Sequence, residues 1–178
     1  MMEPSDLPMP QAVPDAFERR NGNFLLSADR AKLQMDLVRG FLSRSYWANN
    51  RSREVTERAI ANSLCFGIYR VESANAEGDA LPASTDSSSL RQVAFARVIS
   101  DYATFAWLCD VFVAEEFRGH GLGKWLVESA LAHPDLQGLR RWMLATADAH
   151  DLYRQFGFVE LAAPERWTER FSPSEPGR

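Results

Sequence analysis

The sequence predicts one α/β domain, in which helices cover both faces of a single β-sheet. Three observations support this fold class. The chain has 178 residues, of which 46% are hydrophobic and 25% charged, as in one globular domain. Segments of strand length alternate with segments of helical periodicity along most of the chain. The segments at 90–100 and 104–113 are apolar on both faces, which is typical of central strands covered on both sides.

The first third of the chain predicts one strand followed by two helices. Residues 1–20 contain four prolines and are expected to form a flexible arm or an edge segment. A strand is expected at 23–28. Asp29 is a candidate N-cap for a first helix, in which apolar residues recur at helical spacing. Either Asn50 or Ser52 can cap the second helix.

The middle of the chain predicts three strands, the first separated from the next by a long loop. Residues 64–71 have the apolar and β-branched content of a strand. Residues 72–89 are small and polar, and are expected to form a mobile loop between two strands. The two central strands described above follow this loop.

The last third predicts two helices that alternate with strands. Asp148 is a candidate N-cap for the second of these helices, and Gly157 suits its left-handed C-terminal end. The expected elements are a helix at 122–133, a strand at 140–146, the short helix, a strand at 158–161, an edge strand near 167–171 and a tail at 172–178. A single domain is therefore expected over 21–171.

Composition excludes several other classes of protein. The net charge is −4 and the chain has no basic run, so a nucleic acid is not expected as a partner. No apolar run approaches the roughly 20 residues of a membrane-spanning helix, and the acidic N-terminus lacks a signal-peptide pattern. A cytoplasmic location without membrane contact is expected. Cys65 and Cys109 are expected to be buried free thiols. The three histidines lack metal-ligand spacing, so no metal is expected.

A glycine-rich turn at 115–123 is the strongest local signal. Gly119, Gly121 and Gly123 precede or open a predicted helix, where backbone N–H groups point outward and the helix dipole adds positive potential. Such a turn can bind an anion such as a phosphate. Its glycine spacing fits neither the P-loop nor the dinucleotide-binding fingerprint. From the glycines alone, a tight turn without a ligand is an open alternative.

Two motifs together resemble the GNAT superfamily of acyltransferases. The spacing of Arg118, Gly121 and Gly123 resembles the coenzyme A loop of that family. Further along the chain, residues 152–158 (LYRQFGF) resemble its second hallmark, Leu-Tyr-x-x-x-Gly-Phe. The resemblance covers about residues 24–161. It implies a mixed, mostly antiparallel sheet that is splayed at its central strands.

The resemblance also implies how acetyl-CoA, the cosubstrate, would bind. The backbone of Val111, Phe112 and Val113 would pair with the pantetheine arm, and the splay would form an amide-lined hole for the thioester carbonyl. The glycine-rich loop would hold the pyrophosphate. The loop residues concerned are Arg118, Gly119, His120, Gly121, Leu122, Gly123 and Lys124.

Two residues are candidates for the proton transfers of amine acetylation. Tyr153 matches the family position that faces the sulfur and acts as general acid; the alternative is a core tyrosine. Asp110 is a carboxylate in an otherwise apolar strand, which is costly unless it is paired or used. Polyamine-type members carry a Glu-Asp pair here, whereas this chain has Cys109 before Asp110. Either Asp110 or a water is therefore the expected base, and a purely local salt-bridge role for Asp110 is the alternative.

Aromatic residues are expected to form the wall of the substrate pocket, because the family builds it from the first helices and the early strand ends. The candidates are Tyr46, Trp47, Tyr102, Phe105 and Trp107. Each could instead belong to the core. The nearby Arg44, Arg51 and Arg53 could bind a substrate carboxylate, but solvation of the helix ends is favoured.

The predicted function is acetyl-CoA-dependent N-acetylation, in which an amine attacks the thioester directly. A small-molecule amine is favoured as acceptor, and a protein amine is the second choice. The alternative from another class is a catalytically silent acyl-CoA-binding module that regulates a partner. Such a module would keep the glycine-rich loop but need neither Tyr153 nor Asp110. A homodimer is left open.

Overall fold

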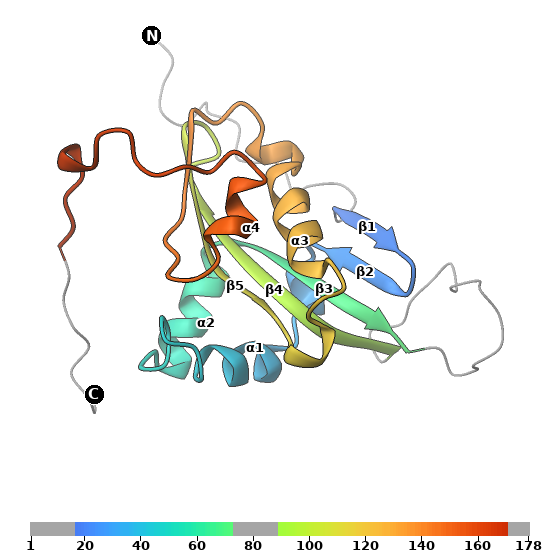
Figure 1. Ribbon diagram of the computed structural model, residues 1–178. Coiled ribbons are helices and arrows are strands. Elements are labelled where there is room, and N and C mark those ends of the chain that lie inside the picture. Colours follow the sequence, from blue (N-terminus) through green and yellow to red (C-terminus); the bar gives the residue numbers. More distant parts are fainter. Residues whose placement is uncertain (1–16, 73–88, 171–178) are drawn as a thin grey trace, which may run out of the picture.

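One six-stranded sheet forms the centre of the molecule (Figure 1). The computed structural model describes residues 17–72 and 89–170. The strands lie in the order of the sequence, and every neighbouring pair is antiparallel except the last, which is parallel. They are β1 (Glu18–Asn21), β2 (Phe24–Ser27), β3 (Leu64–Val71), β4 (Leu90–Ser100), β5 (Phe105–Val113) and β6 (Arg141–Met143). The predicted α/β fold with a mostly antiparallel sheet is confirmed.

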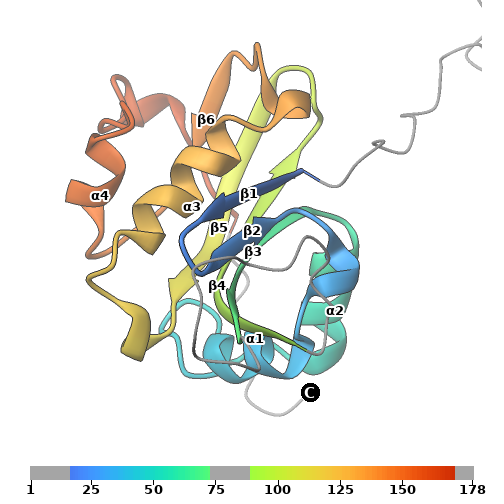
Figure 2. The ribbon, with the colours of Figure 1, turned by 90° about the vertical axis from the view of Figure 1, so that its right-hand side faces the viewer.

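Helices cover both faces of the sheet, as Figures 1 and 2 show. One face carries α1 (Met35–Leu42) and α2 (Arg53–Ala61), and the other carries α3 (Leu122–Leu131) and α4 (His150–Arg154). The Ser52 hydroxyl caps α2 by accepting a hydrogen bond from the Val55 N–H at 3.2 Å, which selects Ser52 over Asn50. Short 3-10 helices lie at Arg30–Lys32, Glu115–Phe117, Pro134–Leu136 and Pro164–Arg166.

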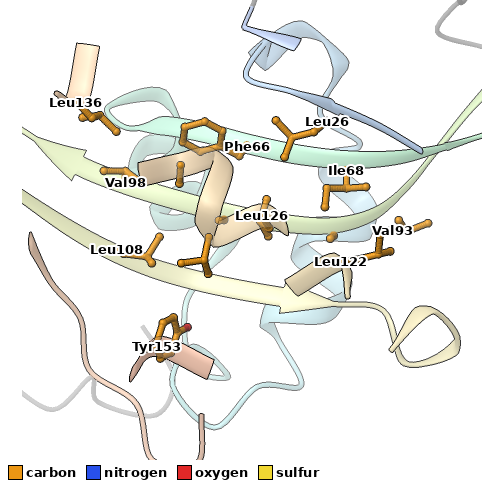
Figure 3. Packing of buried hydrophobic residues seen from close by; sticks show 14 of the residues in the cluster. Leu26, Phe66, Ile68, Val93, Val98, Leu108, Leu122, Leu126, Leu136 and Tyr153 are labelled. Carbon is orange, nitrogen blue, oxygen red and sulfur yellow. The ribbon is translucent and has the colours of Figure 1, made fainter. Parts of the chain in front are cut away.

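The main hydrophobic core lies between α3 and the sheet (Figure 3). Leu126 of α3 is fully buried there against strand residues such as Phe66, Val98 and Leu108. A second core lies under α1 and α2, where the rings of Phe41 and Phe112 stack with centroids 3.9 Å apart. Because β5 contributes to both cores, its two faces are apolar, as the sequence predicts.

A β-bulge in β5 determines the geometry of the central strands. Across β4, Phe95 faces Phe112 and Arg97 faces Cys109, so β5 uses three residue steps where β4 uses two. Within the extra step, Asp110 has a left-handed backbone with a φ of 53°, which Asp tolerates better than most residues. Bulges bend a strand and increase its twist. β5 accordingly pairs with β6 only over its first three residues, which confirms the predicted splay.

The N-terminal part of the domain agrees with the prediction only in part. Of the two structures expected for residues 1–20, a flexible arm or an edge segment, the described residues form the second: β1 is an edge strand, and Phe17 packs on the buried ring of His133. The domain therefore begins before residue 21. The expected cap at Asp29 serves a 3-10 helix, where its carboxylate accepts the Ala31 N–H at 2.9 Å. The backbone is extended again at Leu33, so the α-helix begins only at Met35.

The C-terminal part forms fewer strands than predicted. β6 has three residues rather than the expected seven, and neither 158–161 nor the described part of 167–171 is a strand. A segment becomes a strand only where it can pair with the edge of a sheet. Residues 158–161 pack through single side chains instead: the Phe158 ring meets the Tyr153 ring edge-on with centroids 6.0 Å apart, while Val159 is exposed. Gly157 has the expected left-handed backbone. Residues 1–16, 73–88 and 171–178, which include most of the expected loop and the tail, lie outside the described residues.

The buried His133 makes stability depend on pH. Its ring lies between Phe17 and Phe66, with centroids 4.8 and 5.6 Å away, and its Nδ1 accepts the Asp135 N–H at 3.3 Å. Burial lowers the pKa of His133, although the charge of Asp135 opposes the shift. The free energy of unfolding is therefore expected to fall as pH drops below about 6.5, because the unfolded chain takes up a proton that the folded chain resists. The slope is at most about 1.4 kcal/mol per pH unit.

Urea unfolding at a series of pH values measures this slope. The contribution of neutral His133 to the free energy of unfolding should be complete above the ordinary pKa of histidine. It should be lost as pH falls toward the lowered pKa of His133 in the folded chain. His133→Phe removes the titrating group and should flatten the slope, whereas His150→Gln, at an exposed position, should keep it. An unchanged slope in His133→Phe would assign the effect to other groups.

Candidate active site

A cavity of about 510 Å³ opens where β5 and β6 separate. Its walls come from the segment between α1 and α2, from β4 and β5, and from the segment between β6 and α4. They are Tyr46, Trp47, Arg51, Arg97, Trp107, Leu108, Cys109, Asp110, Val111, Ala145, Thr146, Ala147, Asp148, Ala149 and Tyr153. A larger hollow of about 760 Å³ lies between β6 and residues 156–167, but it contains none of the predicted site residues. The cavity at the splay is therefore the candidate active site.

Tyr153 projects from α4 toward β5 (Figure 3). It is one of the residues that line this cavity. The residue is 8% exposed, and its hydroxyl has no hydrogen-bond partner among the described residues. Burial, followed by the nearby Tyr46 and Asp148, raises the pKa of Tyr153 to about 12. The phenol therefore keeps its proton at neutral pH and is free to donate it. The general-acid role of Tyr153 stays a prediction, and its place on the cavity wall is compatible with it.

Asp110 is held by two arginines at the base of the cavity. Arg51 donates from its two terminal nitrogens to the two carboxylate oxygens at 2.7 and 3.3 Å, and Arg97 Nε donates at 2.8 Å. Burial by itself raises the pKa of Asp110, but the hydrogen bonds and charges of the two arginines outweigh it and lower the pKa. Asp110 is therefore a paired carboxylate with little tendency to accept a proton.

Arg97 is a cavity residue that the sequence did not single out. It lies in β4 with 8% of its side chain exposed, and it also donates to the Ser63 hydroxyl at 3.0 Å. The signal that singled out Asp110, a charge in an apolar strand, was equally present at Arg97. Arg51, predicted to solvate a helix end, instead pairs with Asp110.

The glycine-rich loop leaves a row of unpaired backbone donors. Gly119 and Gly121 have left-handed backbones, with φ of 80° and 75°, and Gly121 is the N-cap of α3. Among the described residues, no acceptor meets the N–H groups of Gly119 through Lys124. Phe117 anchors the loop in the core, and His120 Nδ1 lies 3.0 Å from the Arg118 carbonyl oxygen. The loop can therefore bind an anion such as a pyrophosphate.

The end of β5 lies between this loop and the cavity. Val111 lines the cavity, and Val113 lies beneath Gly123, where an added Cβ would be 3.6 Å from the valine methyl group. The side chain of Phe112 points to the other face of the sheet and stacks on Phe41, so only its backbone faces a ligand. Because β6 pairs with no residue of β5 beyond Trp107, this edge is open for an extended ligand.

Three of the five predicted wall residues, Tyr46, Trp47 and Trp107, line the cavity. Tyr102 and Phe105 do not. Tyr102 lies in the turn between β4 and β5, half exposed, and Phe105 begins β5, five residues or roughly 17 Å from Asp110 along the strand. Tyr102 and Phe105 were included because they are aromatic and lie at an early strand end. The sequence alone did not show which end of β5 faces the splay.

The segment between β6 and α4 completes the wall and corrects a further expectation. The Tyr46 hydroxyl accepts the Ala147 N–H at 3.1 Å, which joins this segment to the one between α1 and α2. Asp148 does not cap α4, whose N-cap position is Ala149 and which has no side-chain cap. The Ala149 N–H donates to Thr146 Oγ1 at 3.1 Å. Asp148 is exposed and lines the cavity, whereas His150 does not line it.

Other chemistries have little support in the described part of the chain. Burial raises the pKa of the Cys109 thiol to about 11 and that of Cys65 to about 12, so neither is a reactive thiolate at neutral pH. Within residues 17–72 and 89–170, no group of three His, Cys, Asp or Glu side chains could hold a metal ion. No helix in these ranges is long and apolar enough to span a bilayer.

Comparisons with known proteins agree with the motifs and the splayed sheet. A family model described as an acetyltransferase (GNAT) domain matches residues 86–160. A Gibberella zeae protein classed as an acetyltransferase is 34% identical over 137 residues, which cover 74% of this chain and 76% of that protein. Among solved structures, a GNAT-family protein of Xanthomonas campestris is 44% identical, with a TM-score of 0.72 over 87% of this chain and 97% of that one.

A more distant structure shares the fold alone. A Staphylococcus aureus protein is 18% identical, with a TM-score of 0.59 over 84% of this chain and 99% of that one. The relatives cover most of this chain, and the residues matched by the family model include the glycine-rich loop and α4. The chain belongs to the GNAT superfamily of acetyltransferases.

Proposed function

We propose that the chain transfers the acetyl group of acetyl-CoA to a small-molecule amine. One observation carries the proposal: the unpartnered phenol of Tyr153, the open edge of β5 and the unpaired amides of the glycine-rich loop belong to one continuous region around the splay. A silent acyl-CoA-binding module would need the loop but not a free phenol in the cavity. The amine, the cosubstrate and the order of events are the proposed parts.

The chain supplies binding, orientation and a proton. Acetyl-CoA supplies an acetyl thioester, which is already activated. The N–H groups of Gly119 to Lys124 are suited to hold its pyrophosphate at the start of α3, where the helix dipole assists. Backbone groups of Val111 to Val113 are suited to hold the pantetheine arm and to polarise the thioester carbonyl. Tyr153 then donates its proton to the departing thiolate as the amine attacks.

Removal of the proton from the attacking ammonium is assigned to water rather than to Asp110. The sequence left both open. Two guanidinium groups occupy the oxygens of Asp110 and lower its pKa, so protonating it would break charge-assisted hydrogen bonds. Its role in the proposal is to position Arg51 and Arg97.

A small-molecule acceptor is favoured over a protein amine. The cavity volume lies within the range of roughly 300–1,000 Å³ that is usual for small-molecule sites. The hydrogen bond from Ala147 to Tyr46 joins two of its walls, which narrows the approach for a bulky chain. A protein N-terminus or lysine is the second candidate.

The test of acetyl-CoA binding uses two glycines with the same backbone. Acetyl-CoA should raise the melting temperature, because a ligand that binds only the folded chain stabilises it. At a concentration 100 times its dissociation constant, the free energy of unfolding should increase by about 2.7 kcal/mol. Gly121→Val should abolish this shift, because the Cβ atoms would project into the open space at the start of α3. Gly138→Val is the matched control: Gly138 also has a φ of 75° and open surroundings, but lies outside the loop. It should carry the same backbone strain and keep the shift.

A melting temperature unmoved by millimolar acetyl-CoA in the unmodified chain would overturn the proposal. Equal loss of the shift in both variants would show that it depends on general stability rather than on the loop.

A further inference from the structure

The cavity contains more charge than acetyl transfer to a simple amine requires. Of its described wall residues four are charged: Arg51, Arg97, Asp110 and Asp148. The first three form a buried cluster at one wall, and Asp148 lies on the segment between β6 and α4. A neutral cavity would suit an uncharged amine, so the arrangement of these charges carries information about the acceptor.

The arginine wall has one net positive charge. Two guanidinium groups share one carboxylate, and their side chains are only 22% and 8% exposed, so water screens them weakly. Arg51 uses two of its five N–H donors on Asp110, which leaves others for a ligand. A guanidinium fork matches a planar carboxylate, and one net charge matches a carboxylate better than a doubly charged phosphate.

Asp148 supplies the opposite charge near the reacting end of the cavity. It does not have the capping role that the sequence predicted for it, because α4 begins after Ala149 and has no side-chain cap. Asp148 and Tyr153 line the same cavity, and the segment that carries Asp148 leads directly into α4, which carries Tyr153. An ammonium group attracted by Asp148 would therefore lie close to the proposed proton donor.

We infer that the acceptor is a zwitterion, a primary amine that also bears a carboxylate, as in an amino acid. Arg51, supported by Arg97, binds the carboxylate, and Asp148 attracts the amine toward Tyr153. The rings of Tyr46, Trp47 and Trp107 flank the body of the molecule. This inference rests on the proposed acetyl transfer and specifies its acceptor.

The test compares matched acceptors with the full chain. The standard amino acids, each with its carboxamide and its decarboxylated amine, are assayed for release of the coenzyme A thiol. Calorimetry measures their binding to the protein saturated with coenzyme A. For the best series, the carboxylate form should exceed both analogues by tenfold or more, in kcat/KM and in affinity. If the amide or the decarboxylated amine performs equally well, or no amino acid binds, the inference is overturned.

Variants at Arg51 assign the discrimination to that residue. Arg51→Gln should reduce the ratio of carboxylate to carboxamide kcat/KM at least tenfold, mainly through KM. Arg51→Lys keeps the charge without the fork and should give an intermediate ratio, which remains informative if Arg51→Gln fails to fold. Arg53→Gln is the control, because Arg53 pairs with Glu57 outside the cavity, and its ratio should equal that of the unmodified chain.

The acetyl-CoA melting shift separates the two proposals. A normal shift without carboxylate discrimination, or with a ratio unchanged in both Arg51 variants, rejects only the zwitterion. The absence of a shift rejects the proposed transfer and this inference with it.

Discussion

Replacing Tyr153 with phenylalanine should lower kcat by roughly 100-fold or more, the scale of a lost general acid. The change keeps the ring and its edge-on contact with Phe158, and removes only the hydroxyl. Because that hydroxyl has no partner among the described residues, the variant should still fold, and its affinity for acetyl-CoA should stay within a few-fold of the original. Thiol release with a saturating amine measures kcat, and the melting shift reports acetyl-CoA binding.

Tyr69→Phe is the matched control. Tyr69 is fully buried, its hydroxyl is likewise unpaired among the described residues, and it lies in β3 and does not line the cavity. The same substitution there should leave kcat unchanged. If Tyr153→Phe turns over at the original rate on the best acceptor, Tyr153 is a core tyrosine and the thiolate leaves without its help.

Replacing Asp110 with asparagine should destabilise the fold by about 3 kcal/mol, because it leaves two arginines without their buried counter-charge. Asparagine tolerates the left-handed backbone at this position, so the loss reports the charge rather than strain. The value lies at the lower end of the usual range since Arg51 is about a fifth exposed. For a chain of this length, it corresponds to a fall in melting temperature of roughly 6–12 °C.

The pH dependence of stability gives a second measure of the ion pairs that Asp110 forms with Arg51 and Arg97. The lowered pKa of Asp110 means that its stabilisation is present above the ordinary pKa of aspartate, about 3.9, and is lost as pH falls toward the lowered value. Asp110→Asn should lack this acid-dependent part. Asp36→Asn is the control: its carboxylate is 97% exposed beside Arg39, so its effect should stay within about 0.5 kcal/mol.

Activity of Asp110→Asn distinguishes a positioning role from that of a base. A base would make the loss recover as pH rises above the pKa of the amine, whereas loss of positioning persists at every pH and raises KM for the acceptor. An unchanged melting temperature together with recovery at high pH would restore Asp110 as the base.

Local features of this chain were determined by the sequence itself. The glycine-rich loop could be predicted because its structure depends on neighbouring residues: Gly119 and Gly121 adopt backbones that other residues avoid, and a helix start exposes its N–H groups wherever it occurs. The cap at Ser52 and the helix end at Gly157 follow for the same reason. The order of strands and helices, and therefore the fold, could be predicted from similar local patterns: hydrophobic periodicity, helix caps and turn residues.

The composition of the cavity was decided by the tertiary structure alone. Arg51 and Arg97 reach Asp110 across 59 and 13 residues of chain, and an isolated charge in a sequence does not show its partner. The short helix α4 begins after Ala149 without a side-chain cap, and Asp148 lines the cavity instead. The walls depended on a bulge that shifts β5 by one residue, because the faces of a strand alternate and one extra residue exchanges them.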